Sequence, residues 1–210
     1  MILPGIPYLL IVTSSRGEKW HLSLFEMPNR KARNGISRFF VFLSWWCDEN
    51  EVPLPLDMKY RILFVCHGNI CRSPMAEFVM KDLVKKAGLA DSFVIESAAT
   101  STEEIGNTVY PPARRKLAEH GIGCAGKTAR QMTRSDYNRF DLLIGMDSWN
   151  IRNMRNICGG DPEDKIKMLM DYTHRPGDVA DPWYTGDFEA TWRDVLEGCQ
   201  QLLAELEARL

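Results

Sequence analysis

The arrangement of hydrophobic and polar positions along this chain changes near residue 58. Beyond that point, short apolar runs typical of buried strands alternate with segments of helical periodicity. The apolar runs predict four strands, at Tyr60–Val65, Phe93–Ser97, Asp141–Met146 and Lys165–Met170. The periodic segments predict four helices, at 73–87, Pro112–His120, Ser148–Asn156 and Phe188–Leu210.

Strands that alternate with helices in this way indicate an α/β fold. We expect a doubly wound, mostly parallel four-stranded sheet with helices on both faces. Pro74, at the favoured first position of a helix, and Gly88, at its end, support the first strand–helix unit. Ligands of such sheets bind beyond the carboxyl ends of the strands. The loop after the first strand is therefore the first candidate for a functional site.

Residues 1–57 lack such periodicity, and proline, glycine, arginine and aromatic residues are mixed there without order. We therefore expect an extension of uncertain structure at 1–57, dispensable for function, and one domain at 58–210 with Met58 as its functional start. The alternative is that the apolar run Phe39–Trp46 docks on the domain or on a membrane surface, because large exposed apolar patches are unfavourable.

Composition narrows the class of protein only a little. Hydrophobic residues make up 45% and charged residues 26%, which is ordinary for a soluble globular protein. The formal net charge of −2 gives no reason to expect nucleic acid or a membrane surface as a partner. No stretch is long enough to cross a bilayer. The run Phe39–Cys47 follows a basic segment like a signal peptide, but it starts far from the N-terminus and lacks a small-residue cleavage site.

The six cysteines are too sparse and irregular for a disulfide scaffold. They form no C-x-x-C pair, and the four histidines are not clustered near them, so we expect no zinc or other metal and no cofactor. This cysteine usage favours a reducing, cytoplasmic location. The sequence gives no strong signal for assembly, and we expect a monomer or a weak dimer.

The loop after the first strand reads VCHGNICRSP, in which Arg72 follows Cys66 by six positions and Ser73 comes next. The spacing alone is weak evidence, but its place between a strand and a helix start makes coincidence improbable. Five intervening residues can wrap their N–H groups around one anion, and the helix N-terminus points at the same place. Gly68 and Asn69 are residue types that tolerate the left-handed backbone of a tight loop.

The chemistry of this loop follows from those residue types. Arg72 can hold two phosphate oxygens through its planar guanidinium. The same positive field favours the thiolate form of Cys66, which makes it a nucleophile. Ser73 can donate a hydrogen bond to that thiolate or cap the helix. Cys66 as a mere core hydrophobe and Arg72 as a solvated helix residue are the alternatives, and the loop context argues against both.

VCHGNICRSP followed by MAE closely resembles the phosphate loop of the low-molecular-weight protein tyrosine phosphatases. Further motifs occur in that family's order: ESAATS at 96–101, GKTARQ at 126–131, LLIGMD at 142–147 and DPWY at 181–184. The resemblance covers residues 58–210 and implies a flavodoxin-like phosphatase fold. It also implies hydrolysis of phosphotyrosine in proteins, or of small aryl phosphates, through a phosphocysteine intermediate.

The resemblance further implies roles for individual residues. Cys66 would be the nucleophile, Arg72 the phosphate ligand and Asp181 the general acid. Substrate contacts would come from the loop and from an aromatic wall: His67, Gly68, Asn69, Ile70, Cys71, Trp183 and Tyr184. Ser73 and Ser97, together with Asn69, would hold the loop, and Asp147 would be a supporting carboxylate.

The residues alone leave part of this open. Asp181 stands before Pro182 in a loop, which suits a positioned proton donor, but aspartate is common in turns. Trp183 and Tyr184 could equally be packing residues. Asp147 could simply cap the helix that follows it.

Three positions depart from the family pattern. His67 stands where an aliphatic residue is frequent, Glu103 where many members have an aromatic residue, and Lys127 where a histidine is frequent. These differences concern the preferred substrate rather than the central chemistry.

Other functions are possible on the same scaffold. An arsenate reductase needs two more thiols to relay a disulfide, and Cys124 and Cys158 lack the paired pattern. A protein-arginine phosphatase would carry threonine where this chain has Ile70. A phosphate-binding module without turnover would not need Cys66, Arg72 and Asp181 together. Cys71, five residues from the nucleophile, is expected to trap an oxidised Cys66 as a reversible disulfide, unless it is only a buried loop residue.

Overall fold

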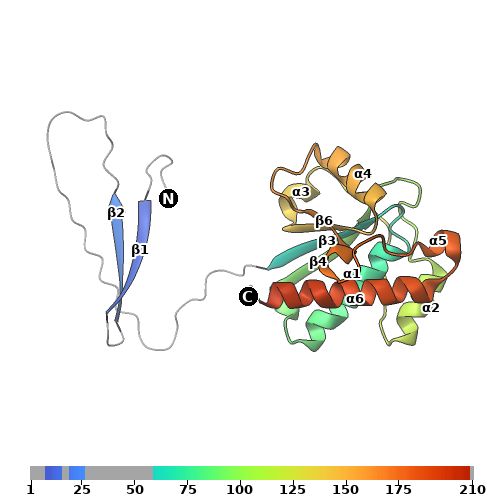
Figure 1. Cartoon of the computed structure of the whole chain (residues 1–210), viewed down its shortest axis with the longest axis horizontal. Helices are drawn as coiled ribbons and strands as arrows, with labels where there is room; N and C mark the ends of the chain where they lie inside the picture. The colour runs from blue at the N-terminus through green and yellow to red at the C-terminus, as the bar shows by residue number, and fades with distance from the viewer. Residues whose placement is uncertain (1–7, 16–18, 27–58, 209–210) are drawn as a thin grey trace. The chain divides into compact units, whose positions relative to one another are not determined.

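The computed structural model describes residues 8–15, 19–26 and 59–208, and the chain divides into two compact units, Met1–Val52 and Pro53–Leu210. In the first unit, strands β1 (Tyr8–Ser15) and β2 (Lys19–Glu26) form an antiparallel pair (Figure 1). This pair was not predicted from the sequence. Phe39–Trp46, for which docking was considered, lies outside the described residues.

The second unit contains a four-stranded sheet whose strands are all parallel, in the order β4-β3-β5-β6. The strands are β3 (Tyr60–Cys66), β4 (Phe93–Ala99), β5 (Leu142–Gly145) and β6 (Ile166–Met168). The predicted four-stranded parallel sheet is therefore confirmed. The last predicted strand is wrong in its second half, because Leu169–Tyr172 turn into the 3₁₀ helix η2.

The four predicted helices are present, with ends that differ by a few residues from the expectation. They are α1 (Arg72–Lys86), α2 (Pro111–Glu119), α4 (Ser148–Cys158) and α6 (Phe188–Glu207). Besides η2, three more short elements were not predicted: the 3₁₀ helix η1 (Ala90–Ser92) and the single-turn helices α3 (Asp136–Arg139) and α5 (Pro182–Thr185). Elements of three or four residues are too short to show a hydrophobic period.

Helices cover both faces of the sheet, with α1, α2 and α6 on one face and α3 and α4 on the other (Figure 1). The central strand β3 explains why both faces are covered. Ile62 and Phe64 belong to the apolar cluster beneath α1 and α6, whereas Leu63 and Val65 belong to the cluster beneath α3 and α4. Successive strand residues point to opposite faces, so an uninterrupted apolar run requires a layer on each side.

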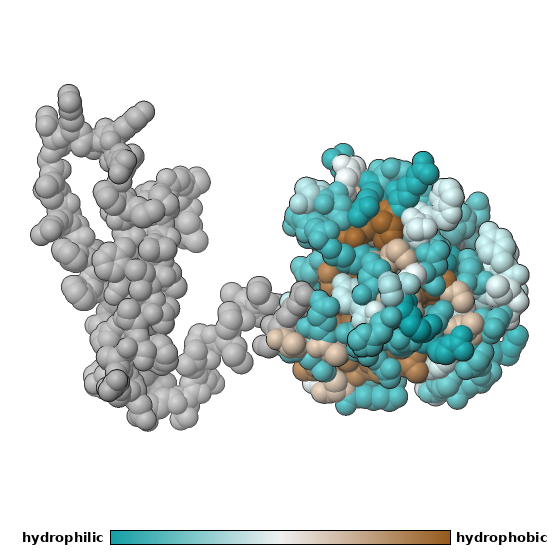
Figure 2. Space-filling view, viewed as in Figure 1, coloured by the Kyte–Doolittle hydropathy of each residue, from teal (hydrophilic) through white to brown (hydrophobic). Residues whose placement is uncertain are grey.

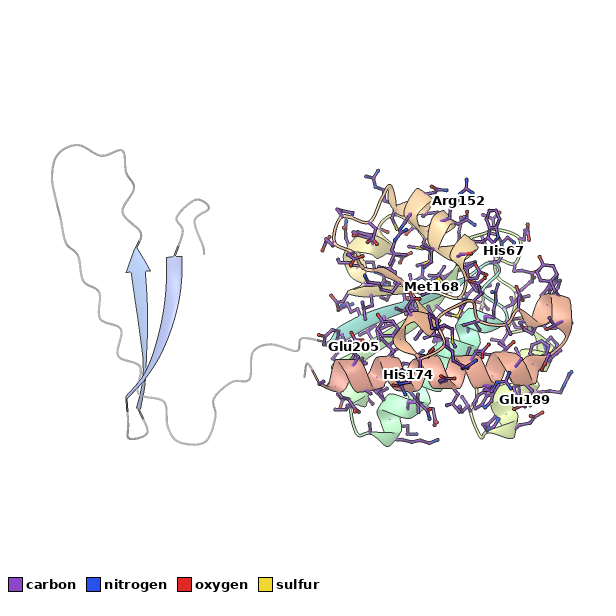
Figure 3. The ribbon with its side chains drawn as sticks, viewed as in Figure 1. His67, Arg152, Met168, His174, Glu189 and Glu205 are labelled. Carbon is purple, nitrogen blue, oxygen red and sulfur yellow. The ribbon has the colours of Figure 1, made fainter. Side chains whose placement is uncertain are left out.

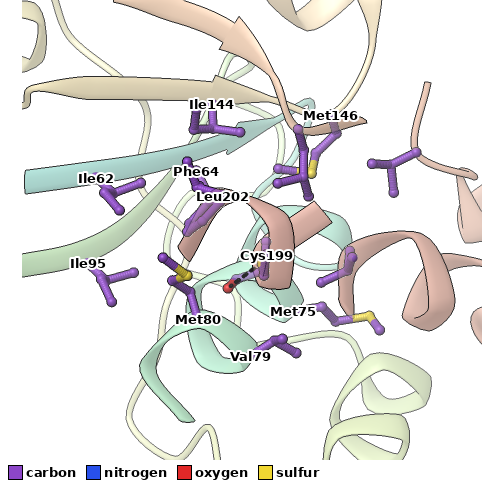
Figure 4. Packing of buried hydrophobic residues seen from close by; sticks show 14 of the residues in the cluster. Ile62, Phe64, Met75, Val79, Met80, Ile95, Ile144, Met146, Cys199 and Leu202 are labelled. Carbon is purple, nitrogen blue, oxygen red and sulfur yellow. Dashed lines mark hydrogen bonds between the residues drawn. The ribbon is translucent and has the colours of Figure 1, made fainter. Parts of the chain in front are cut away.

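The larger cluster joins α1 and α6 to the sheet. Phe64 packs there with Met80 of α1 and Leu202 of α6, and the Cys199 thiol contacts the Ala76 carbonyl oxygen at 3.7 Å (Figure 4). Gly198 allows α6 to approach η2, because a Cβ at this position would lie 2.5 Å from Cγ of Leu169. This packing fixes α6 against the sheet, and with it the loop that precedes α6.

The surface of this unit is mostly hydrophilic on the face drawn in Figure 2, with apolar residues in small areas. Within the residues that the structure describes, no helix is long and apolar enough to cross a membrane. The carboxyl ends of the parallel strands meet at one edge of the sheet, where the loops after β3, β4 and β5 come together.

Candidate active site

The loop from Cys66 to Arg72 connects the end of β3 directly to the start of α1. Asn69 has a φ of 59°, the left-handed conformation that lets the chain turn tightly. Gly68 was expected to share this role, but it is not among the residues with positive φ. Its small size has another use, since a Cβ at Gly68 would lie 3.1 Å from Cγ of Glu104. A Cβ at this position would therefore be in tight contact with Glu104 unless that side chain shifted.

The Cys66 thiol lies at the bottom of this loop and is almost fully buried. The backbone N–H of Asn69 donates to its sulfur at 3.3 Å, and the Ser73 hydroxyl lies 3.1 Å from it. The N-terminal end of α1, a helix of 15 residues, lies beside the sulfur. Backbone N–H groups and a helix N-terminus stabilise negative charge, so the surroundings suit a thiolate.

Asn69 holds the loop through every polar atom of its side chain. Its Nδ2 donates to the hydroxyls of Ser73 at 2.9 Å and Ser97 at 2.8 Å, and its Oδ1 accepts from the backbone N–H of Arg130 at 3.2 Å. Ser73 and Ser97, expected to support the loop, are thus brought together by Asn69. A buried, fully paired network of this kind favours one loop conformation.

A buried carboxylate, which the sequence did not reveal, extends this network. Glu77 of α1 accepts from Ser97 at 2.6 Å and pairs with Lys127 at 2.8 Å and with Lys81 at 2.5 Å. Burial raises the pKa of Glu77, but the two lysines and Ser97 outweigh burial and leave the pKa lowered. Lys127, where the family often has histidine, also donates to the Ser97 carbonyl oxygen at 3.0 Å. Lys127 therefore supports the Cys66–Arg72 loop through Glu77 and Ser97.

Arg72, which is only 4% exposed, contacts two carboxylates at once. Its Nη1 donates to Asp147 at 2.6 Å, and its Nη2 lies 2.7 Å from Asp181. Burial lowers the pKa of Arg72, but Cys66, Asp181 and Asp147 raise it by more, so the guanidinium stays charged. Asp147 also caps α4 by accepting from the N–H of Asn150 at 2.6 Å. Asp147 therefore both contacts Arg72 and caps the helix that follows it.

The loop that carries Asp181 is held from two sides. The backbone N–H of Ala180 donates to Asp194 at 3.2 Å, and its carbonyl oxygen accepts from the Thr191 hydroxyl at 2.8 Å. The N–H of Val179 donates to the Met146 carbonyl oxygen at 2.8 Å. The sequence did not single out Thr191 or Asp194, two buried polar residues of α6.

Asp181 itself caps the short helix α5: its Oδ1 accepts from the N–H of Trp183 at 3.0 Å. The aromatic side chains that follow are exposed, Trp183 to 57% and Tyr184 to 86%. Trp183 lies 5.5 Å from the ring of Tyr110. Within the described domain the Tyr184 side chain makes no hydrogen bond or ring contact. Both residues are therefore available to a ligand at the mouth of the site.

Another part of the rim is polar. His67 lies at the surface of the domain (Figure 3) and its Nε2 is 3.1 Å from the carboxylate of Glu103. The loop residues Ile70 and Cys71 are buried and pack with Ala129. Burial, followed by the charges of Cys66 and Asp181, raises the pKa of Cys71 to about 12. Cys71 is therefore a neutral thiol beside the nucleophile. In the described part of the chain no three metal-binding side chains come together.

A buried thiol and an arginine that share a loop at a helix N-terminus, on a parallel α/β sheet, are the arrangement found in cysteine-dependent phosphatases. The comparisons with known proteins narrow this class. A family model described as "Low molecular weight phosphotyrosine protein phosphatase" matches residues 61–210. The chain belongs to this family.

Similarity to individual relatives supports the same family membership. The low molecular weight protein-tyrosine-phosphatase YfkJ of Bacillus subtilis is 41% identical over 148 residues, which cover 70% of this chain and 95% of the relative. Its crystal structure has a TM-score of 0.70 and covers 72% of this chain and 96% of that one. The low molecular weight phosphotyrosine protein phosphatase of Sus scrofa is 38% identical over 151 residues, 69% of this chain and 94% of the relative.

A Drosophila arginine phosphatase has the same fold. Its crystal structure is 29% identical, has a TM-score of 0.64, and covers 69% of this chain and 96% of that one. The fold therefore carries more than one substrate class, and the preference of this chain depends on its own site residues.

Proposed function

We propose that this protein hydrolyses phosphotyrosine in proteins through a phosphocysteine intermediate at Cys66. The observation that carries the proposal is the pair of contacts at Arg72, which lies between Asp147 and Asp181 in the loop that holds the Cys66 thiol. One small site thus contains a nucleophile, a phosphate ligand and a proton donor.

Phosphate binding would rearrange one of these contacts. The loop N–H groups and the N-terminus of α1 would bind phosphate oxygens, and Arg72 would add its planar fork. The Asp181 carboxylate uses Nη2 of Arg72, which a phosphate oxygen would need. A bound phosphate would therefore displace Asp181. Its carboxylate, no longer paired with Arg72, would take up a proton from solvent and stand as a carboxylic acid beside the leaving group. Asp147 would keep Arg72 oriented through Nη1.

Two displacements then complete the reaction. The Cys66 thiolate attacks phosphorus while the bond to the phenolic oxygen breaks, and Asp181 gives its proton to that oxygen. This step leaves a phosphocysteine and a free tyrosine. Asp181, now a carboxylate, takes a proton from a water molecule that attacks phosphorus. Inorganic phosphate leaves and the Cys66 thiolate is restored.

The exposed apolar side chains around the candidate active site favour a protein as the substrate. In the described domain four large apolar side chains are exposed: Ile105, Trp149, Trp183 and Tyr184. All four lie in loops or helix starts at the carboxyl edge of the sheet, the edge that carries Cys66. Trp183 and Tyr184 would flank the phosphotyrosine ring, and exposed aromatic residues near a binding site are typical of protein interaction surfaces. Small aryl phosphates would use the same wall.

The alternatives have less support. Cys124 packs in the cluster beneath α1 and α6, whereas Cys158 packs beneath α3 and α4, on the opposite face of the sheet. Among the described residues, Cys124 and Cys158 are therefore poorly placed to form the thiol pair that an arsenate reductase would need. Ile70 is buried and apolar, where a protein-arginine phosphatase would carry threonine.

The proposal includes a cytoplasmic location, a monomer or weak dimer, and reaction without a metal ion or cofactor. The loop amides and Arg72 supply the positive charge that a metal would otherwise give. Full activity in a chelator and inhibition by vanadate are the expected results. Activity that a chelator removes and added metal restores would contradict this part.

A substrate panel tests the central proposal. Matched peptides carrying phosphotyrosine, phosphoserine or phosphoarginine, together with p-nitrophenyl phosphate, are given to the wild-type protein and to Cys66→Ser. We expect turnover of phosphotyrosine and p-nitrophenyl phosphate by the wild type only, with phosphate bound to Cys66 in acid-quenched samples. A preference for phosphoarginine would mean that the substrates are arginine-phosphorylated proteins and not tyrosine-phosphorylated ones. Binding without turnover would identify a binding module.

A further inference from the structure

A pocket of about 410 Å³ opens beside the candidate active site. It lies where α2, α5 and α6 begin, and these ends lie close together in Figure 1. The rings of Tyr110, Trp183 and Phe188 form its apolar walls, and Arg115 adds a guanidinium. Tyr110 is 5.5 Å from Trp183 and 6.1 Å from Phe188, so the three rings form one continuous surface.

Arg115 is exposed, and no described carboxylate lies within ion-pair distance of it. Among the described residues it forms no ion pair, whereas its neighbour Lys116 contacts both Glu119 and Glu189. An unpaired guanidinium beside aromatic rings suits a carboxylate whose methylene groups can lie against the rings. The pocket thus has the chemistry for an acidic side chain.

The pocket is joined to the phosphate loop through backbone contacts. The N–H of Tyr110 donates to the carbonyl oxygen of Ile70 at 2.9 Å, and Trp183 donates to the proton donor Asp181. An extended peptide advances about 3.3–3.6 Å per residue, so a substrate whose phosphotyrosine lies above Cys66 would reach the pocket within a few residues.

The end of the phosphate loop at His67 and Gly68 has negatively charged neighbours. Glu103 contacts His67, and Glu104 lies against Gly68. These carboxylates would repel an acidic substrate residue that lay on their side. The two ends of the loop therefore differ in sign, which would make the preference depend on the direction of the peptide.

We propose that this pocket is a specificity site that binds a glutamate of the substrate protein within a few residues of the phosphotyrosine, with its carboxylate on Arg115. The inference rests on the proposed phosphotyrosine phosphatase function and names part of its substrate.

A peptide series tests this site. A glutamate is placed at each of the three positions before and after phosphotyrosine, with glutamine at the same position as the reference. The readout is the ratio of kcat/KM for each glutamate and glutamine pair, so an effect on the phosphate site itself cancels. Each pair is measured with the wild type, Arg115→Glu and Arg115→Lys. Arg114→Glu is the matched control, because Arg114 is adjacent and exposed but does not line the pocket.

The wild type should prefer glutamate by about three- to tenfold at positions on one side only, as expected for an exposed charge pair aided by ring contacts. Arg115→Glu should abolish or reverse that preference, Arg115→Lys should keep part of it, and Arg114→Glu should keep all of it. If the wild type had the same kcat/KM for glutamate and glutamine peptides, or if Arg115→Glu and Arg114→Glu lost the preference equally, the specificity site would be wrong. The proposed phosphatase function would still stand. No turnover of any peptide would overturn the proposed function as well.

Discussion

Asp194 of α6 accepts a hydrogen bond from the backbone N–H of Ala180, the residue directly before Asp181. Thr191, one turn earlier on the same helix, donates to the carbonyl oxygen of Ala180. Both peptide groups next to the proposed proton donor are thus fixed to a helix that is packed on the sheet. Asp194 is itself held by Arg175 at 3.3 Å. The position of Asp181 therefore depends on α6.

Thr191→Val should loosen this attachment without changing the shape of the side chain. Protonation of the leaving group should be affected most, so kcat/KM should fall about three- to tenfold for phenyl phosphate and less for p-nitrophenyl phosphate. The plot of log kcat/KM against the pKa of the leaving phenol should become steeper. Thr191→Ser keeps the hydroxyl and is the control. An unchanged slope in Thr191→Val would mean that the attachment has no part in proton transfer.

Asp181→Asn removes the proposed proton donor itself. The rate should fall by about 10²- to 10⁴-fold for phosphates of weakly acidic phenols and far less for those of strongly acidic phenols, which leave without protonation. The value of kcat/KM over a series of substituted phenyl phosphates measures this, because it reports the first displacement and not the later hydrolysis of the phosphocysteine. Equal slowing across the series would assign Asp181 another role, such as orienting Arg72.

Glu77→Gln should destabilise the domain at neutral pH by about 2–4 kcal/mol, because two lysines lose a buried partner. The folded-state pKa of Glu77 lies below its ordinary value of 4.5, so its contribution is complete above that value and is lost as the pH falls through the folded pKa. The difference between wild type and variant in urea unfolding should therefore shrink below pH 4.5. Glu119→Gln, at an exposed pair on α2, should cost under about 0.5 kcal/mol. A pH-independent difference would show that Glu77 acts by packing.

Cys71 should protect Cys66 from irreversible oxidation. Peroxide converts the Cys66 thiolate to a sulfenic acid, and the Cys71 thiol would displace water from it to form a disulfide. Oxidation of Cys66 also removes a charge that raises the pKa of Cys71, so the second thiol becomes easier to ionise. Wild type and Cys71→Ser are treated with peroxide and then with excess thiol. We expect wild type alone to recover; full recovery of the variant would exclude this protection.

A protein of residues 58–210 should match the full chain in turnover and, within about 2 °C, in melting temperature. Strand β3 starts at Tyr60, and both its faces are covered by elements of the same unit, so the fold does not need a preceding segment. Thermal unfolding and hydrolysis of p-nitrophenyl phosphate compare the two proteins. A loss of several degrees would show that residues 1–57 pack on the domain.

The sheet could be predicted because a strand buried on both faces needs apolar residues at every position. Phe64 and Val65 point to opposite clusters, and that requirement left an uninterrupted apolar run in the sequence. The phosphate loop was equally visible, since Cys66 and Arg72 must stand at a fixed spacing to surround one anion. Side chains that chemistry fixes within one loop can be found from sequence.

Contacts between distant elements could not be predicted in the same way. Glu77 is separated from Ser97 by 20 residues and from Lys127 by 50, and no local pattern says that they meet. A weak signal existed for Thr191 and Asp194, because both fall on the apolar stripe of α6 that contains Val195 and Leu202. Polar residues on such a stripe need partners, but the sequence does not say which.

The contacts of Arg72 also affect which ions can compete with a substrate. Both of its outer nitrogens already have carboxylate ligands, at 2.6 Å and 2.7 Å. A chloride ion that replaced Asp181 would exchange one single negative charge for another and gain no second acceptor atom. A phosphate dianion brings two charges and several oxygens, enough to replace the carboxylate and use the loop N–H groups as well. We therefore expect Asp181 to weaken the binding of monovalent anions at Arg72 more than the binding of phosphate esters.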